Sequence, residues 1–300
     1  MHKLSIHKEF FVSDKFILQK EENGILTVTI NRPEKLNSMT ITMMMEFAEI
    51  FRRVNTNDDI RVIVVTGEGA YFSAGADISD GLAGFELSKF EGLLSENYDK
   101  DEINRLSPGS HVAQSIFDCQ KPIIAAINGP AAGIGATLIL PMDFRLMSEA
   151  AKIGYVFTRR GFVPEAGSSW FLPRIVGMTK ASDWVLTGRL IEPEEALSSG
   201  LVNSLHHPED LLPAAYALAR ELITKTSPVS LACSRQLLWK MSGAADLSEA
   251  TALETSCFVD RLQHPDALEG AHAFVQKRVP NFTGVVSKHM PRLFSWWGKS

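Results

Sequence analysis

The stretch around which this sequence is organised runs from Asn128 to Pro173 and reads NGPAAGIGATLILPMDFRLMSEAAKIGYVFTRRGFVPEAGSSWFLP. It begins with a glycine-rich turn that leads into an apolar run, and near its end a carboxylate, Glu165, stands between a proline and small residues. A glycine turn can direct backbone N–H groups at a ligand, and apolar surroundings raise the pKa of a carboxyl group. We therefore expect this stretch to supply an oxyanion site and a base.

On the N-terminal side of this stretch, strand patterns and helix patterns alternate. The β-branched runs 61–67 and 123–127 are typical of strands that are covered on both faces, and residues 25–30 alternate as a strand does. Apolar residues recur at helical spacing over 40–54, and the small residues of 71–78 are typical of a loop that enters a helix. This order predicts right-handed βαβ units and an α/β fold.

On the C-terminal side, helical periodicity dominates. The expected helices cover residues 178–187, 192–200, 209–226, 229–242 and 246–262. The chain is accordingly divided into an N-terminal arm at 1–22, a core at 23–205 that carries the catalytic site, and a helical region at 206–300. The polar segment 79–110 either shapes access to the site or forms a solvated helical insertion.

Composition excludes several classes of function. The net charge of −5 and the pI near 5.9 argue against a nucleic-acid-binding surface, because phosphates demand clustered Lys and Arg. No apolar run reaches the ~18 residues that a membrane span needs. The three cysteines are widely spaced, and His206 and His207 lack partner ligands, so neither a disulfide framework nor a metal site is expected. We expect a soluble protein of a reducing intracellular compartment.

Six short motifs recur in a characteristic order over about residues 23–282: Asn31-Arg32-Pro33 with Leu36-Asn37, Phe72-Ser73-Ala74-Gly75-Ala76-Asp77, Lys121-Pro122 through Asn128-Gly129, the run that contains Asp143, Leu172-Pro173 through Gly177, and Glu269-Gly270 through Lys277-Arg278. In this order and spacing they resemble the crotonase (enoyl-CoA hydratase/isomerase) superfamily. The resemblance implies a spiral of ββα units and a helical C-terminal region that mediates trimers or hexamers. It also implies an acyl-CoA thioester as substrate, which carries the CoA, so that no separate cofactor is needed.

The resemblance assigns roles to individual residues as well. The backbone N–H groups of Ala76 and Ile134 would hold the thioester oxygen, since preorganised amides suit a developing oxyanion. The implied CoA-binding residues are Arg32, Lys35, Ala74, Asp77 and Ile78, with Phe274 and Lys277 contributed by a neighbouring subunit.

The acids in this stretch distinguish between the reactions of the superfamily. Hydration requires two positioned carboxylates, which in the hydratase pattern would fall on Thr137 and Phe157, and neither residue is a base. Glu165 instead resembles the single glutamate of peroxisomal-type 3,2-enoyl-CoA isomerases, which are enzymes of fatty-acid β-oxidation. The resemblance therefore implies that Glu165 moves a proton from C2 to C4. The alternative for Glu165 is a Pro-Glu helix start with the acid in the first turn.

Other functions stay open at this point. A dienoyl-CoA isomerase would need a pair of acids, and an acyl-CoA dehalogenase would need Asp in place of Glu165 and a histidine near the first oxyanion segment, whereas none lies between His7 and His111. A hydratase by another route, or a CoA-binding module without catalysis, is also open. The resemblance implies a cytoplasmic location in a bacterium and permits a peroxisomal one in a eukaryote.

Overall fold

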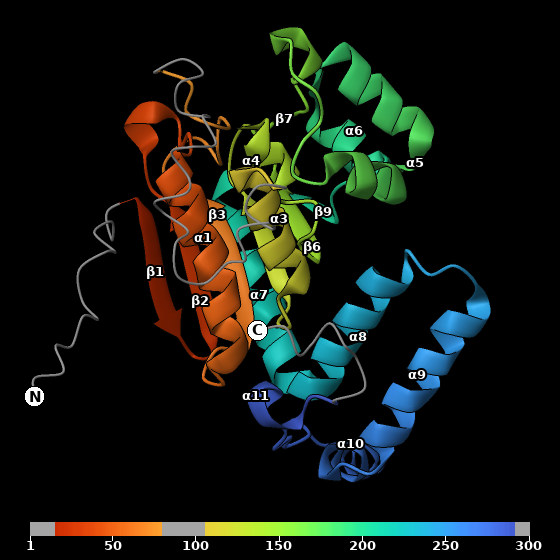
Figure 1. Cartoon of the computed structure of the whole chain (residues 1–300). Coiled ribbons are helices and arrows are strands. Elements are labelled where there is room, and N and C mark those ends of the chain that lie inside the picture. Colours follow the sequence, from red (N-terminus) through yellow and green to blue (C-terminus); the bar gives the residue numbers. More distant parts are fainter. Residues whose placement is uncertain (1–15, 80–105, 292–300) are drawn as a thin grey trace, which may run out of the picture.

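The structure, a computed structural model, describes residues 16–79 and 106–291, and a six-stranded sheet forms its centre (Figure 1). The strand order is β1-β2-β3-β4-β6-β9, in which β1 pairs antiparallel with β2 and the other pairs are parallel. The strands are β1 (Ile17–Glu22), β2 (Ile25–Ile30), β3 (Val62–Gly67), β4 (Ile123–Ile127), β6 (Phe144–Ser148) and β9 (Ser204–His206). Most of the polar segment expected to shape access or to form an insertion, residues 80–105, lies outside the described residues.

Helices follow most of these strands. They are α1 (Ile41–Arg53), α3 (Pro108–Asp118), α4 (Ile134–Thr137), α5 (Ser168–Thr187), α6 (Pro193–Ser198), α7 (Pro208–Lys225), α8 (Pro228–Met241), α9 (Leu247–Leu262), α10 (Pro265–Gln276) and α11 (Val286–His289). Short 3-10 turns form at η1 (Pro33–Lys35), η2 (Val54–Thr56) and η5 (Thr158–Arg160). A second, three-stranded sheet joins β5 (Ala131–Ala132), β7 (Ile153–Gly154) and β8 (Leu190–Ile191). In the described parts of the chain, no helix combines the length and the apolar character that a bilayer crossing requires.

The central sheet is covered on both faces, as its β-branched runs predict. Every residue of β3 is buried, and successive side chains point to opposite faces. Val62 and Val64 pack with the apolar residues of α7, whereas Ile63 and Val65 belong to the cluster that includes α1 and α3. The expected strands at 25–30, 61–67 and 123–127 are confirmed, because each lies at the centre of this two-sided packing.

The expected N-terminal arm at 1–22 is wrong for residues 17–22, which form β1. This strand pairs over its full length with β2, from Ile17 opposite Ile30 to Glu22 opposite Ile25. Only Ile17 of its six residues is buried, so the sequence ILQKEE carries no apolar alternation. Backbone hydrogen bonds at the sheet edge hold β1, and they leave no signal in the side chains.

The expected helical region at 206–300 begins with α7, which packs on the sheet of the core and does not stand apart from it. His206 pairs with Ser148 in the sheet, and the helix that follows, α7, buries Leu211, Ala215 and Leu222 against the sheet. The separate helical region therefore begins at α8, and Figure 1 shows α8, α9 and α10 extending away from the sheet. The predicted helices at 192–200, 209–226, 229–242 and 246–262 themselves are confirmed.

The expected helix at 178–187 is the second half of a longer one. α5 begins at Ser168 and contains a break at Gly177, whose φ of +76° is not helical. Pro173 lies inside the first half. Because proline and glycine both interrupt a helical pattern in sequence, the first half was not predicted.

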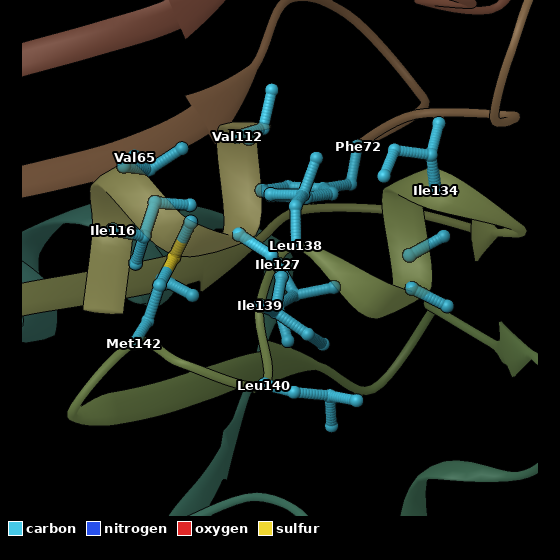
Figure 2. Close-up of a cluster of buried hydrophobic side chains, with 14 of the residues drawn as sticks. Val65, Phe72, Val112, Ile116, Ile127, Ile134, Leu138, Ile139, Leu140 and Met142 are labelled. Atoms are coloured by element: carbon cyan, nitrogen blue, oxygen red, sulfur yellow. The ribbon is translucent and has the colours of Figure 1, made fainter. Parts of the chain in front are cut away.

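An apolar cluster lies beneath the turn that enters α4. Figure 2 shows Ile134 and Leu138 of this region among Phe72, Val112 and other side chains of the large core. Ile134 is 3% exposed and Leu138 is fully buried. The backbone of this turn is therefore supported by packed side chains and not by solvent.

Candidate active site

Two glycine turns meet at the carboxyl ends of β3 and β4. The first contains Gly75, whose φ is +105° and where a Cβ would stand 2.8 Å from the Ala132 carbonyl oxygen. The second contains Gly133, with a φ of +52°, and a Cβ on Gly75 would lie 3.7 Å from the Gly133 Cα. Glycine meets both requirements, the positive φ and the close approach. The residues that follow the two glycines, Ala76 and Ile134, are thereby brought together.

The backbone N–H groups of Ala76 and Ile134 are not used in the backbone hydrogen bonds of the bridge and the helix to which these residues belong. The N–H of Met39 donates to the Gly75 carbonyl at 2.8 Å, and the Met39 carbonyl accepts from Asp77 at 2.9 Å. In such a parallel bridge the intervening N–H, that of Ala76, faces the opposite side. Ile134 is the first residue of α4, so its N–H has no acceptor within the helix. Because their glycines abut, the backbone segments that carry these two amides lie side by side.

Two asparagines hold the loop between β3 and the first glycine turn. The buried Asn37 donates from Nδ2 to the carbonyls of Glu68, at 2.9 Å, and Tyr71, at 2.6 Å. Asn128 donates from Nδ2 to the Gly69 carbonyl at 2.9 Å. Amide side chains can substitute for backbone pairing in this way. Both residues lie in motifs of the sequence, but the motifs by themselves predict no role for them.

Glu165 lies in a tight turn before α5 and not in the first turn of that helix. Ala166 and Gly167, which follow it, have φ values of +53° and +72°, and α5 begins only at Ser168. The Glu165 carbonyl accepts the Ser168 N–H at 3.0 Å and the Ser168 hydroxyl at 2.8 Å. The alternative that Glu165 serves as a first-turn acid of α5 is therefore wrong, since its side chain is turned towards another helix.

That helix is α3, and its first turn surrounds the Glu165 carboxylate. The hydroxyl of Ser107, the N-cap of α3, donates to Glu165 Oε2 at 3.2 Å. A Cβ on Gly109 would stand 2.4 Å from Oε2, 2.9 Å from Oε1 and 2.8 Å from Cδ1 of Ile134. The carboxylate thus lies between the start of α3 and the second glycine turn.

Ser107 and Gly109 are functional candidates that the sequence motifs do not predict. A serine followed by a proline is a recognisable helix start, which could have placed the beginning of α3. A glycine in the first turn of a helix costs stability relative to alanine, and such a cost indicates a close approach by another group. The identity of that group, Glu165, cannot be read from the local sequence.

Burial raises the pKa of Glu165, and the hydrogen bond from Ser107 opposes part of that rise. Among the described residues, no charged side chain shifts this pKa. Asp77 is the opposite case, because hydrogen bonds from Ser79 and Arg32, together with the charge of Arg32, lower its pKa to about 2. Glu165 is thus suited to accept a proton, whereas Asp77 remains ionised.

The positions expected to carry the acids of a hydratase hold no base in the structure either. Thr137 is fully buried, and its hydroxyl donates to the Ile134 carbonyl at 3.2 Å within α4. Phe157 belongs to the large apolar core and is 7% exposed. Neither side chain can activate a water molecule.

The expected CoA-binding residues fall into two groups. Near the first glycine turn, Lys35, Ala74 and Ile78 are exposed, whereas Arg32 donates to Asp77 at 2.5 Å in a salt bridge that is largely shielded from solvent. The Arg32 charge is therefore already compensated within the chain.

The second group, Phe274 and Lys277, lies at the far end of the molecule. Figure 1 shows α10 at the opposite end from α4. Phe274 is 85% exposed and Lys277 follows α10 in a left-handed conformation. Within one chain these two residues do not join the site.

Comparison with known proteins agrees with this architecture. The profile of the enoyl-CoA hydratase/isomerase family matches residues 20–285. The chain is 33% identical over 263 residues to an enoyl-CoA hydratase of Alternaria alternata, covering 87% of this chain and 84% of that protein. It is 33% identical over 277 residues to 1,2-epoxyphenylacetyl-CoA isomerase of Escherichia coli, covering 90% and 99%. The crystal structure of an enoyl-CoA hydratase from Bacillus anthracis superposes with a TM-score of 0.78 at 27% identity, covering 90% of this chain and 100% of that one.

The profile match spans nearly the whole described chain and includes both glycine turns and Glu165. The relatives and the solved structure cover 87–90% of the chain. They confirm the predicted α/β crotonase fold. The chain therefore belongs to the enoyl-CoA hydratase/isomerase family and is an enzyme of the crotonase superfamily.

Proposed function

We propose that this enzyme is a 3,2-enoyl-CoA isomerase, which moves the double bond of a 3-enoyl-CoA thioester into the 2-position. The observation that carries the proposal is the desolvated carboxylate of Glu165, placed against Ile134 beside the paired glycine turns, while Thr137 and Phe157 supply no acid. One base is sufficient for an isomerisation, because the proton that leaves one carbon returns to another. Addition of water would require a second positioned acid.

The proposed reaction begins with removal of a C2 proton by Glu165. The electrons left on C2 delocalise onto the thioester oxygen, and the N–H groups of Ala76 and Ile134 stabilise that dienolate. The protonated Glu165 then donates the same proton to C4, which completes the shift of the double bond. The C2–H group of a thioester is a weak acid, so the raised pKa of the base and the oxyanion donors must act together to remove its proton.

The CoA moiety would extend from the first glycine turn across the exposed backbone at Ala74, with Lys35 nearby for the phosphates and Ile78 beside the acyl end. Because Arg32 and Asp77 neutralise each other, we assign them to the shape of this surface. Phe274 and Lys277 would reach the CoA of a neighbouring subunit in a trimer, or in a hexamer built of two trimers. A product of this kind would enter fatty-acid β-oxidation.

The test compares two substrates and two variants. The enzyme is expected to convert 3-hexenoyl-CoA to 2-hexenoyl-CoA and to leave 2-hexenoyl-CoA without added water. Glu165→Gln should lower kcat/KM roughly 10²- to 10⁴-fold, the usual contribution of a general base. Glu194→Gln, which changes an exposed acid in α6, is the matched control and should keep wild-type activity.

The pH profile gives an independent check on Glu165. A protonated carboxyl cannot accept the C2 proton, so kcat/KM should fall as the pH drops through the pKa of Glu165. Because that pKa is raised, the fall should occur above the usual glutamate value of about 4.3. Hydration of the 2-enoyl substrate, as the names of several relatives suggest, or full isomerase activity of Glu165→Gln, would overturn the proposal.

A further inference from the structure

The first turn of α3 makes contacts with Glu165 that an isolated base would not need. Ser107 Oγ takes part in three interactions: it accepts the Ser110 N–H at 3.2 Å, lies 3.0 Å from Ser110 Oγ, and donates to Glu165 Oε2 at 3.2 Å. The first of these is an ordinary N-cap bond. The hydrogen bond to Oε2, in contrast, is made to the carboxylate that acts as the base in the proposed reaction.

The direction of the protons in this group follows from the donor count. A serine hydroxyl has one proton, and an ionised carboxylate only accepts. The Ser107 proton is therefore given to Glu165 Oε2, and the Ser110 hydroxyl is left to donate its own proton to Ser107. The result is a short chain of hydroxyls that ends on one oxygen of the carboxylate.

Gly109 explains why the carboxylate can come so close to the helix. The 2.4 Å and 2.9 Å distances from a hypothetical Cβ to Oε2 and Oε1 mean that both oxygens occupy space which any side chain would fill. The carboxylate therefore packs directly on the backbone of the first turn of α3. The positive end of the helix dipole favours the ionised form there.

We propose that Ser107 is a positioning residue for Glu165: its hydroxyl keeps Oε2 occupied as an acceptor, so that Oε1 is the oxygen that takes and returns the proton. This inference rests on the proposed function of Glu165. Two equivalent oxygens would let the carboxyl rotate and hold its proton on the side away from the substrate. A fixed Oε2 leaves the proton on the oxygen that faces the carbon chain.

The same contact makes a prediction about ionisation. The Ser107 bond lowers the pKa of Glu165 and burial raises it, so removing the hydroxyl leaves the rise unopposed. Ile134 of α4 and the residues Ala166 and Gly167 before α5, which lie around the carboxylate, are not titratable. The titratable residue of α3 nearest to Ser107 is His111, one turn farther along and buried.

The experiment measures pH profiles of kcat and KM for 3-hexenoyl-CoA with four variants. Ser107→Ala should move the acidic limb of kcat/KM to higher pH by roughly one unit, since a hydrogen bond to a charged group has about that effect. At neutral pH this variant should lose kcat while KM is unchanged. Ser107→Thr, which keeps the hydroxyl and the cap, should restore the wild-type profile.

Two further variants separate positioning from a purely structural role. Ser107→Gly also removes the hydroxyl, but glycine is tolerated at an N-cap with little loss of helix stability. It should therefore show the same shift of the acidic limb as Ser107→Ala, even if Ser107→Ala itself folds poorly. His111→Gln should leave the acidic limb where it is. A loss that is equal at every pH, or an acidic limb that follows His111 and not Ser107, would overturn the inference.

Failure of the proposed function would look different. If Glu165→Gln retains isomerase activity, Glu165 is not the base, and the profiles at Ser107 then carry no meaning for this reaction. If Glu165→Gln is inactive while Ser107→Ala and Ser107→Gly both keep the wild-type pH profile, Glu165 is supported as the base and the positioning role of Ser107 is contradicted.

Discussion

At the scale of single residues, the candidate site contains two carboxylates with opposite surroundings. Glu165 is held by one hydroxyl in a largely desolvated position, and its pKa is raised. Asp77, which follows Ala76, receives hydrogen bonds from Ser79 and Arg32, and its pKa falls to about 2. In the proposed reaction, this separation of pKa values would distinguish the acid that exchanges protons from the one that fixes a loop.

Gly109 is the residue at which this arrangement is most easily broken. In Gly109→Ala the new Cβ would overlap both Glu165 oxygens and Cδ1 of Ile134. The carboxylate must then move, and a displacement of about 1 Å can cost ~10²-fold in rate. We expect kcat/KM to fall by roughly that factor while the melting temperature changes little, because alanine is the better helix former.

A matched glycine shows whether the effect is specific. Gly270, inside α10, has Phe282 at 3.6 Å from a hypothetical Cβ, which is an ordinary contact. Gly270→Ala should keep its activity and gain up to about 1 kcal/mol of stability. Wild-type kinetics in Gly109→Ala would show that the carboxylate is not held where the structure places it.

At the scale of elements, α3 is fixed at both ends. Its first turn holds Glu165, and the carbonyls at its last turn accept hydrogen bonds from Arg235 of α8, among them Ile116 at 2.9 Å and Phe117 at 3.0 Å. Arg235 also donates from Nε to Asp143 Oδ2 at 2.7 Å. A cation at a helix C-terminus satisfies its free carbonyls and its dipole. Arg235 therefore couples α8 to the helix whose first turn contacts the Glu165 carboxylate.

Arg235→Met should be strongly destabilising. Arg235 is 4% exposed, so its loss removes the counter-charge of the shielded Asp143 carboxylate and a hydrogen-bond donor to several carbonyls. We expect the free energy of unfolding to fall by about 3–5 kcal/mol, measured by urea denaturation. Arg174→Met is the control, because Arg174 is exposed and its guanidinium stacks over Trp170 at 4.0 Å, a contact worth about 1 kcal/mol or less. Equal costs for the two variants would contradict the role given to Arg235.

At the scale of the whole molecule, the C-terminal helices expose more apolar surface than one chain explains. Phe258 and Leu262 of α9 are 65% and 56% exposed, and Phe274 of α10 is 85% exposed. Cys257 is the one buried residue of α9. Apolar side chains that gather on adjacent helices mark an interaction surface, which agrees with the proposed trimer.

Phe258→Asp is expected to dissociate the oligomer. A charge in an apolar interface is costly to bury, so sedimentation velocity should show the trimer or hexamer replaced by monomers. If Phe274 and Lys277 contact the CoA of a neighbouring subunit, as proposed, KM for the acyl-CoA should rise at the same time. Leu186→Asp, at an exposed leucine of α5, should leave the trimer intact. A wild-type protein that is monomeric at all concentrations would contradict the proposal.

The elements that the sequence predicts well are those whose signal is local. The runs 61–67 and 123–127 are apolar because both of their faces are covered, and α7 and α9 carry helical periodicity over their whole length. β1 escaped prediction because one edge of backbone bonds holds it. The first half of α5 escaped because Pro173 and Gly177 interrupt its pattern.

For the site, the sequence by itself determined the parts: two glycine turns, an acid at 165, and no acid at Thr137 or Phe157. What only the tertiary structure decided is how they meet. Ser107 and Glu165 are 58 residues apart, and Gly75 and Gly133 belong to loops after different strands, so no local pattern records their contact. The parallel sheet brings these loops to one edge, and the packing of α3 against it turns an ordinary N-cap serine towards the carboxylate.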